Sequence, residues 1–203
     1  MKYRPNEKID YDEAFFTSGK SYDKFAHCET QGIFKEQVDM LIEVIGSIEG
    51  KSLLDVGGAL GWFAKRCIDE GAYAYCQEVS LWACKNSPIP SKMRCCDAGD
   101  EILAMDDSFD IVTCIECLEH IDNVKQALRE ISRVLKKGGL FFCIVGLSET
   151  YSHIHIGTPT DWYLMLDSTP GLTIDKELTE KIRNTRCCTE RHWASKSFFL
   201  RGV

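Results

Sequence analysis

Residues 53–61 read LLDVGGALG, an apolar stretch with one acid that runs into a turn rich in glycine. The apolar part predicts a buried strand, and a helix is expected after the glycines, continuing to Glu70 and ending at Gly71 as its C-cap. A strand, a glycine-rich turn and a helix in this order let backbone amides approach a polar ligand closely. The stretch is therefore typical of a nucleotide-binding unit.

Apolar runs alternate with amphipathic segments along most of the chain. Buried strands are expected at residues 52–56, 72–79, 93–96, 109–115 and 140–145. Amphipathic helices are expected at residues 31–48 and from Asp122, as an N-cap, to Gly138-Gly139. Beyond residue 150 we expect only a helix near 160–166 and a strand near 197–201. This alternation predicts the α/β class, with a doubly wound parallel sheet that binds ligands beyond the carboxyl ends of its strands.

The glycine turn lacks the signatures of two common nucleotide sites. A dinucleotide fingerprint that starts at Gly57 needs glycines where this chain has Ala59 and Trp62. A Walker A loop ends in Gly-Lys-Ser/Thr, and none follows here. NAD, with an oxidoreductase function, and ATP are both disfavoured.

Further segments extend the pattern in the same order along the chain. They are QEVS at residues 77–80, Asp97 after the third predicted strand, SFDIVTCIECLEH at residues 108–120 and ISRVLKKGG at residues 131–139. Together with LLDVGGALG, these segments resemble the class I S-adenosylmethionine-dependent methyltransferases of the small-molecule type. Within that family, they are most similar to the quinone-biosynthesis O-methyltransferases, the Methyltransferase type 11 group.

The resemblance implies a Rossmann-like fold with a mostly parallel, seven-stranded sheet and helices on both faces. It implies S-adenosylmethionine as the cofactor and S-adenosylhomocysteine as the product. The residues that it places at the cofactor are Asp55, Gly57, Gly58, Gly61, Glu78, Val79, Asp97, Ala98 and Ile115. Ala59 departs from the family's central glycine. If that position needs a positive φ, its Cβ costs about 1 kcal/mol.

The implied activity is methyl transfer to an oxygen, nitrogen or carbon of a small-molecule acceptor. The sulfonium already activates the methyl group, so the protein mainly has to align a nucleophile with it. His120 is the expected general base, because an imidazole titrates near neutrality and this one follows a predicted strand. Glu116 is the second catalytic candidate.

The segment around His120 also suggests a divalent metal. Glu116, Glu119 and His120 have i, i+3, i+4 spacing, which places them on one face of a helix. Two carboxylates and an imidazole suit Mg²⁺, Mn²⁺ or Zn²⁺. The E-x-x-E-H string resembles the metal-binding string of quinone-biosynthesis O-methyltransferases and of small-RNA 3′-terminal 2′-O-methyltransferases. His153 or His155 would complete the set, and we assign His155. The alternative is that Glu119 and His120 serve without a metal, as in much of the superfamily.

The charge is unevenly distributed. The formal net charge is −7, which disfavours binding to nucleic acid. Residues 181–203 nevertheless carry six Lys or Arg against Glu190 alone, so a segment of +5 follows a body of −12. The segment is either a solvated face or a site for an anionic acceptor group. A metal-assisted RNA 2′-O-methyltransferase and a non-catalytic cofactor-binding or partner domain stay open as alternatives.

We interpret residues 1–203 as a single methyltransferase domain. Its expected parts are an N-terminal lid and helix (1–49), a cofactor-binding core (50–146), and acceptor-side and C-terminal strands (147–203). Tyr11, Phe15 and Tyr22 are candidates for the lid, and Trp162 and Tyr163 for the wall of an acceptor pocket.

Cysteine content and hydropathy suggest a cellular location. The chain has eleven cysteines without a regular spacing, and its first ten residues contain no apolar signal region. Reduced thiols and a cytoplasmic location are therefore expected. The longest apolar run, residues 140–147, is too short to span a membrane. The sequence does not determine the oligomeric state.

Overall fold

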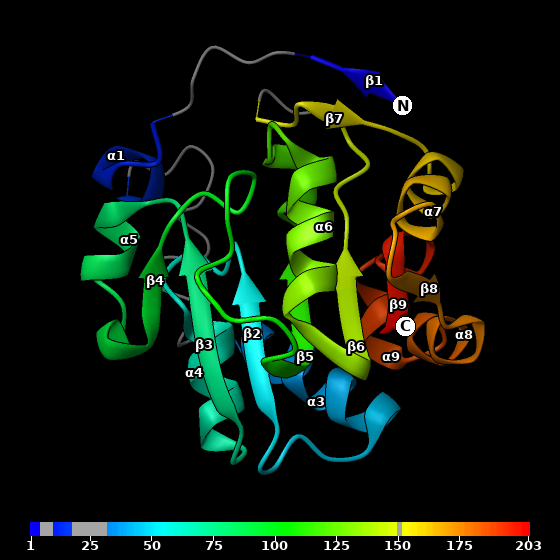
Figure 1. Ribbon diagram of the computed structural model, residues 1–203, viewed down its shortest axis with the longest axis horizontal. Helices are drawn as coiled ribbons and strands as arrows, with labels where there is room; N and C mark the ends of the chain where they lie inside the picture. Colours follow the sequence, from blue (N-terminus) through cyan, green and yellow to red (C-terminus); the bar gives the residue numbers. More distant parts are fainter. Residues whose placement is uncertain (5–9, 18–31, 150–151) are drawn as a thin grey trace.

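A seven-stranded sheet forms the centre of the computed structural model (Figure 1). The structure describes residues 1–4, 10–17, 32–149 and 152–203. In spatial order the strands are β4 (Met93–Cys95), β3 (Tyr73–Glu78), β2 (Ser52–Val56), β5 (Phe109–Ile115), β6 (Leu135–Ile144), β9 (Ser197–Gly202) and β8 (Leu172–Ile174). Neighbouring strands from β4 to β6 are parallel, whereas β9 is antiparallel to both of its neighbours. The predicted doubly wound, mostly parallel sheet of seven strands is confirmed.

Strand β2 lies in the middle of the parallel part of the sheet. Its residue Leu53 is opposite Ala74 of β3 and Ile111 of β5. Leu53, Leu54 and Val56 are fully buried, as expected for a strand that is covered on both faces. The glycine turn that follows β2 therefore starts near the centre of the sheet's carboxyl edge.

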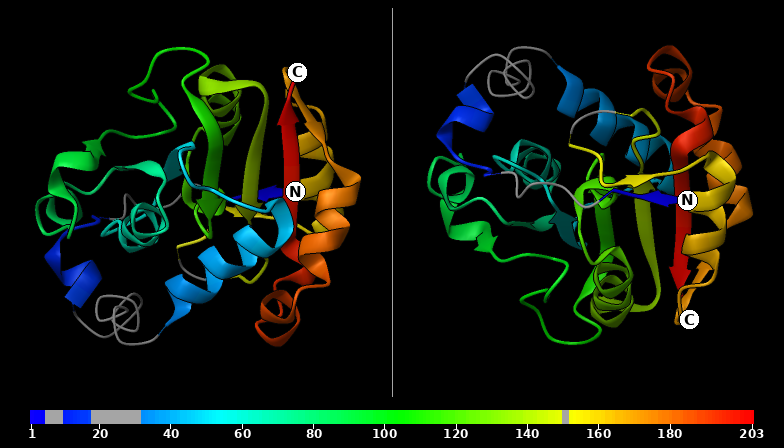
Figure 2. Two further views of the ribbon diagram at one scale, coloured as in Figure 1. Left: turned by 90° about the horizontal axis from the view of Figure 1, so that it is seen from below. Right: turned by 90° about the horizontal axis from the view of Figure 1, so that it is seen from above.

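Helices cover both faces of the sheet (Figure 2). On one face, α6 (Val124–Val134) and α7 (Pro159–Asp167) share a core with Val112, Phe141 and Phe198. On the other face are α3 (Ile33–Ile45), α4 (Trp62–Asp69), α8 (Lys176–Arg183) and α9 (Arg186–Glu190). Their apolar side chains pack against Phe142 and Phe199, whose rings stack. None of the helices that the structure describes is long and apolar enough to cross a membrane.

Strand β9 brings the C-terminal segment to the carboxyl edge of the sheet. Because β9 runs against β6, its first residue, Ser197, pairs with Ile144 at the end of β6. The 3-10 turn η4 (Ala194–Lys196) comes directly before it. Val145 donates a 3.0 Å hydrogen bond to the carbonyl of Lys196. The segment just before β9 is thus held beside the end of β6.

Short elements complete the carboxyl side of the molecule. The two-residue strands β1 (Lys2–Tyr3) and β7 (His155–Ile156) pair there, beyond the ends of the parallel strands (Figure 1). The other short elements are α1 (Glu13–Thr17), α5 (Leu81–Lys85), η2 (Pro90–Lys92) and η3 (Leu118–His120).

Two predicted details of α6 are wrong. The helix ends at Val134 rather than at Gly138-Gly139, because residues from Leu135 onward already pair in β6. The N-cap is Asn123 rather than Asp122, and its side chain makes no capping hydrogen bond. The Asp122 carboxylate instead accepts a hydrogen bond from the Tyr3 hydroxyl.

The expectation that Trp162 lines a pocket is also wrong. Its side chain has no exposed surface and belongs to the core beneath α7. Burial of its apolar ring accounts for the position of Trp162, because this residue lies on the face of α7 that is turned toward the sheet. Tyr163 packs against the same core and is partly buried.

Candidate cofactor and acceptor site

The glycine turn after β2 has a backbone that few side chains tolerate. Gly57, Ala59 and Gly61 have φ values of 71°, 53° and 79°, in the left-handed region. Ala59 therefore adopts the conformation that the family's glycine would adopt more easily, at a cost of about 1 kcal/mol. A Cβ on Gly57 would lie 2.0 Å from the Cys117 Sγ. The turn is thus closely packed against the end of β5.

Glu78 ties this turn to the end of β3. Its Oε2 accepts a 2.9 Å hydrogen bond from the Ala59 amide, and its Oε1 accepts one of 2.9 Å from the Ser80 amide. The carboxyl is almost fully buried, and burial raises its pKa although these bonds act in the opposite direction. Each carboxylate oxygen keeps a second lone pair, which suits it to accept a hydrogen bond from a hydroxyl group.

Asp55 lies beneath the turn. The Thr113 hydroxyl donates a 2.7 Å hydrogen bond to its Oδ1, and a Cβ on Gly58 would lie 2.2 Å from its Oδ2. Burial raises the pKa of Asp55 to about 7, against the effect of the Thr113 bond. These contacts suit Asp55 to order the backbone of the turn.

The other expected cofactor residues are at the same edge. Val79 follows β3 and is exposed, and Ile115 ends β5 and is half-buried. After β4, Asp97 is exposed and accepts a 2.7 Å hydrogen bond from the Gly99 amide, while Ala98 is buried. The residues predicted from three separate motifs therefore share one edge of the sheet.

Glu119 forms the centre of a second cluster, after β5. Its side chain is fully buried in η3, and its Oε1 accepts a 2.7 Å hydrogen bond from the Gly146 amide. Its Oε2 has no hydrogen-bond partner among the residues that the structure describes. The Nε2 atoms of His120 and His153 lie 4.0 Å and 3.9 Å from Oε1. The ligand atoms of Glu119, His120 and His153 all fall within 4.8 Å of one another.

Backbone carbonyls orient both imidazoles. The Nδ1 of His120 is 2.8 Å from the Ser152 carbonyl, and that of His153 is 2.7 Å from the Ser148 carbonyl. Since a carbonyl only accepts, each Nδ1 carries the proton and each Nε2 keeps a lone pair. Burial lowers the pKa of His120 to about 4 and lowers that of His153 as well. Burial, followed by the Glu116 charge, raises the pKa of Glu119 to about 8.

Two residues that we assigned to the metal lie outside this cluster. Glu116 has a φ of 52° and forms an ion pair with Lys196. The Nε2 of His155 donates to the carbonyls of Ile121 and Asp122, at 3.0 Å and 3.2 Å. The predicted helical face does not form, because the chain makes a left-handed turn at Glu116 and then enters η3. His153, the other histidine that we considered, joins Glu119 and His120.

Gly146 and Lys196 are site residues that the sequence did not reveal individually. A Cβ on Gly146 would lie 2.3 Å from the Glu119 Oε1 and 2.4 Å from the His153 Cε1. Gly146 follows a predicted strand, which was a weak signal for a ligand-side position. Lys196 carried no local signal, because only the antiparallel course of β9 brings it to this edge.

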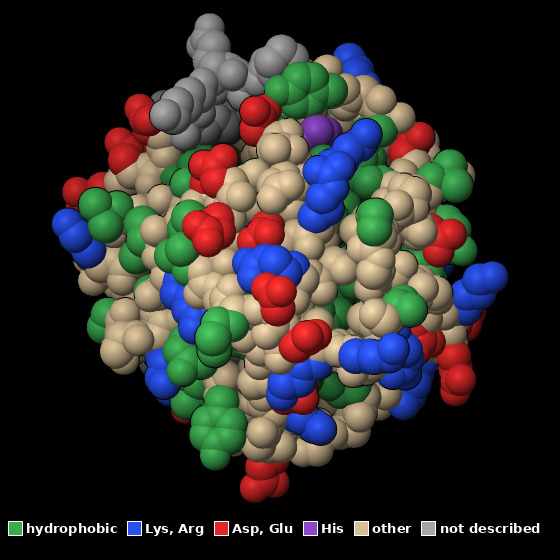
Figure 3. All heavy atoms as spheres, viewed as in Figure 1, with side chains coloured by type: hydrophobic (Ala, Val, Ile, Leu, Met, Phe, Trp, Pro, Cys, Tyr) green, Lys and Arg blue, Asp and Glu red, His purple; other side chains and the backbone are tan. Residues whose placement is uncertain are grey.

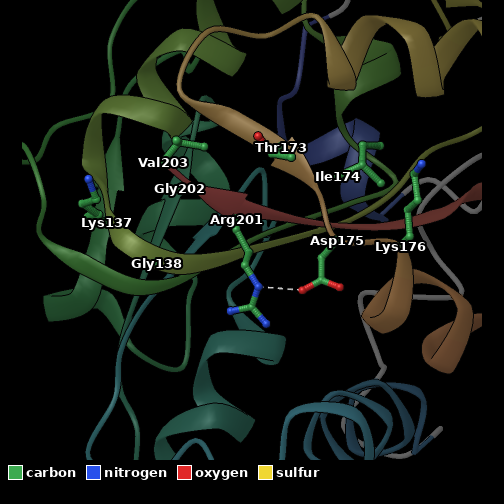
Figure 4. Close-up of a pocket in the computed structure, with 9 residues that line it drawn as sticks. All are labelled: Lys137, Gly138, Thr173, Ile174, Asp175, Lys176, Arg201, Gly202 and Val203. Carbon is green, nitrogen blue, oxygen red and sulfur yellow. Dashed lines mark hydrogen bonds and ion pairs between the residues drawn. The ribbon is translucent and has the colours of Figure 1, made fainter.

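Most of the basic C-terminal segment is engaged elsewhere. Lys181 donates to the Val44 carbonyl and Arg183 to the Ser197 carbonyl. Arg186, Arg191 and Arg201 form ion pairs with Glu190, Glu36 and Asp175. The Arg201–Asp175 pair lines a shallow hollow that also includes Lys137, at the amino-terminal start of β6 (Figure 4). This hollow lies at the opposite end of the sheet from the glycine turn.

Aromatic residues of the N-terminal segment pack beside the glycine turn. Phe16 of α1 stacks on Trp82 of α5, with ring centroids 5.5 Å apart, in a cluster that includes Ala59 and Leu60. The lid candidates Tyr11 and Phe15 are partly buried against this cluster. The third candidate, Tyr22, lies outside the described residues.

Comparison with known proteins finds that this chain resembles methyltransferases. Residues 54–143 match a family model described as a methyltransferase domain. A ubiquinone biosynthesis O-methyltransferase of Chromobacterium violaceum is 33% identical over 103 residues, which cover 47% of this chain and 44% of that protein. The chain therefore spans less than half the length of this relative.

Longer but more distant matches agree with this result. A ubiquinone biosynthesis O-methyltransferase of Photobacterium profundum is 26% identical over 184 residues, covering 75% of each chain. A solved putative methyltransferase of Bacillus halodurans has a TM-score of 0.61 at 18% identity, covering 82% of this chain and 95% of that one. The matched motifs, the relatives and the fold all support a class I S-adenosylmethionine-dependent methyltransferase.

Proposed function

We propose that this chain transfers a methyl group from S-adenosylmethionine to a nucleophilic atom of a small-molecule acceptor. The observation that carries this proposal is the position of Glu78. Its carboxylate is held by the Ala59 and Ser80 amides at the end of β3, directly beside the glycine turn. An acid at this place in a doubly wound sheet is suited to bind ribose hydroxyls.

The remaining residues of the edge fit the rest of the cofactor. The glycine turn offers backbone without side chains to the methionine portion, and Asp97 and Ala98 offer a carboxylate and an amide to the adenine. The exposed side chain of Val79 supplies an apolar surface near them. When bound, the cofactor supplies a methyl group on a sulfonium, and the protein has to hold the acceptor in line with it.

Two groups are suited to receive a proton from the acceptor. The Nε2 of His120 keeps a lone pair and can accept a proton, although burial lowers its pKa to about 4 and so makes it a weaker base than a free imidazole. Glu116 presents a carboxylate that is 37% exposed, between β5 and the segment before β9. We assign proton acceptance to His120 and keep Glu116 as the second catalytic candidate.

Calorimetric titration with S-adenosylmethionine, S-adenosylhomocysteine and NAD tests this function. We expect both sulfur ligands to bind and NAD not to bind. Transfer of a labelled methyl group to a panel of small hydroxy, amino and activated-carbon compounds tests turnover. Tight binding of NAD alone would overturn the assignment, and cofactor binding without transfer to any compound would favour a non-catalytic domain.

We propose in addition that Glu119, His120 and His153 hold a divalent metal. The fit rests on the donor set: two imidazoles keep Nε2 lone pairs, and a buried carboxylate has an oxygen without a partner among the described residues. Carbonyls that bind the opposite ring nitrogen are the usual support of metal-bound histidines. A metal there would act as a Lewis acid toward an acceptor oxygen. With a metal bound, His120 would be a ligand, and Glu116 would be the remaining candidate for proton acceptance.

Surface charge favours a small molecule over RNA as the acceptor. On the face shown in Figure 3, acidic and basic side chains alternate without a continuous basic area. Most of the basic residues of the C-terminal segment are paired with acids or carbonyls of the same chain. Binding to a nucleic-acid backbone relies on Lys and Arg that face phosphates. We also propose a cytoplasmic location, which is supported by the free thiols of all the described cysteines.

A further inference from the structure

Lys196 is the basic residue of the C-terminal segment whose charge lies at the carboxyl edge of the sheet. Its backbone is fixed there by the hydrogen bond from Val145. Its side chain is 17% exposed, and the ammonium contacts the carboxylate of Glu116. A cation that is mostly withdrawn from water is costly unless oxygen acceptors or an opposite charge compensate it, because burial penalises the charged form.

Within the part of the chain that the structure describes, the hydrogen-bonding capacity of this ammonium is only partly used. An ammonium group has three N–H donors. Among the described residues, the structure gives Lys196 a single hydrogen-bond acceptor, the Oε1 of Glu116. Donors in a partly buried position favour oxygen acceptors, since an unmatched buried donor costs free energy. Oxygen atoms of a ligand are the natural partners for the remaining donors.

The present partner of Lys196 indicates the chemistry that it binds. Glu116 offers an oxyanion, and its side chain is 37% exposed, about twice as much as that of Lys196. The carboxylate is thus the more exposed member of the pair, so water can solvate it when another oxyanion takes its place at the ammonium. A bound sulfonium adds a positive charge to this edge, which favours an acceptor that carries a negative one.

We propose that Lys196 binds an oxyanion of the methyl acceptor, a carboxylate or a phosphate, and so positions the acceptor for methyl transfer. In the absence of the acceptor, the carboxylate of Glu116 forms an ion pair with the ammonium of Lys196. This proposal rests on the proposed methyltransferase function and names the acceptor class of the same site. Lys196 then determines the specificity for an anionic acceptor. The other basic residues of the segment stabilise the fold.

Binding of small probes tests this proposal without knowledge of the natural acceptor. Benzoate, phenyl phosphate and the neutral analogue benzamide are titrated into ¹⁵N-labelled protein saturated with S-adenosylhomocysteine, and the amide shifts around residues 116 and 196 are followed. We expect at least one of the two anions to bind, and benzamide to bind at least tenfold more weakly. Binding of benzoate alone assigns the site to carboxylates, and binding of phenyl phosphate alone assigns it to phosphates.

Four variants locate the binding group. K196Q should weaken anion binding at least tenfold, whereas K196R should retain it. E116Q should tighten anion binding at least threefold, because it removes the competing carboxylate. R201Q, at the opposite end of the sheet, is the matched control and should bind as the wild type does.

Several results would overturn the proposal. They are the absence of anion binding to the wild type, equal anion affinity in K196Q and the wild type, or benzamide binding as tightly as the anions. If K196Q does not fold, as judged by lost binding of S-adenosylhomocysteine, E116Q decides, and unchanged anion affinity in E116Q contradicts the proposal. The anion titration is repeated on protein without S-adenosylhomocysteine, so that it does not depend on cofactor binding. A wild type that binds no sulfur ligand then refutes the proposed function separately.

Discussion

The backbone amide of Ala59 and the carboxylate of Glu78 are joined by a hydrogen bond of 2.9 Å, which links the glycine turn after β2 to the end of β3. One side chain thus both shapes the turn and faces the expected ribose.

E78A removes both functions. A hydrogen bond to a charged group contributes about 1.5–3 kcal/mol, so affinity for S-adenosylhomocysteine should fall at least tenfold by calorimetry. E70Q, which alters an acid paired with Arg66 on α4, is the control and should leave the affinity unchanged. Equal affinities of E78A and the wild type would remove the main support for the cofactor site.

His153 and His155 provide a matched pair for the metal proposal. They are two residues apart, yet only His153 lies beside Glu119 and His120. H153A should weaken binding of Zn²⁺ or Mn²⁺ at least tenfold, measured by calorimetry on chelator-treated protein without cofactor. H155A should keep the wild-type affinity for the metal. If the wild type binds neither ion, or if both variants bind equally, the cluster is a set of packed polar side chains without a metal.

The buried carboxyl of Glu119 predicts a loss of stability as the pH rises. Its pKa is raised from 4.5 to about 8 in the folded protein. Between these values the folded state keeps a proton that the unfolded chain has lost. The free energy of unfolding should therefore fall by about 1.4 kcal/mol per pH unit from this group, until the pH passes its folded pKa. The pKa of Asp55 is raised to about 7, so this group also lowers the free energy of unfolding as the pH rises, over a lower pH range than Glu119 does.

Urea unfolding of metal-free protein at pH 5 to 8 measures this decline. E119Q has no carboxyl to ionise, so its stability should fall less steeply than that of the wild type. E149Q changes an exposed acid and should reproduce the wild-type slope. The same slope in E119Q as in the wild type would show that Glu119 ionises normally in the folded protein.

Gly146 should tolerate no side chain. In G146A the new Cβ would meet the Glu119 Oε1 at 2.3 Å and the His153 Cε1 at 2.4 Å, so both side chains must move. Overpacking of this kind costs about 1–3 kcal/mol, and metal affinity should fall together with stability. In G138A the added Cβ meets nothing within 4 Å, but the φ of 74° is strained. That variant should lose about 1 kcal/mol of stability and keep its metal affinity, as judged by thermal unfolding and calorimetry.

The sequence was most informative where neighbouring residues determine structure. β2 and β5 begin and end where the apolar runs do, and the acid Glu78 ends β3 as its motif predicted. The carboxyl ends of parallel strands meet at one edge, so local motifs were sufficient to group the cofactor residues. Ala59 is instructive as well, because the position where the family has a glycine does have a left-handed backbone, and an alanine adopts it here.

The acceptor side was harder to predict because its residues meet only through tertiary structure. The helical spacing of Glu116 with Glu119 suggested one shared face, but the left-handed turn at Glu116 separates them. Glu116 instead meets Lys196, which is eighty positions away along the chain. Such a contact follows from the antiparallel course of β9, and no periodicity in either segment encodes it.

The reversed direction of β9 has a consequence for the order in which the protein is made. The strands that surround the glycine turn are all synthesised before β9, whereas the ammonium of Lys196 leaves the ribosome long after them. The strands around the glycine turn are therefore available early, whereas the edge that carries Lys196 is complete only when β9 pairs with β6 and β8 pairs with β9. Late addition of β9 thus separates in time the proposed cofactor site from the proposed acceptor site.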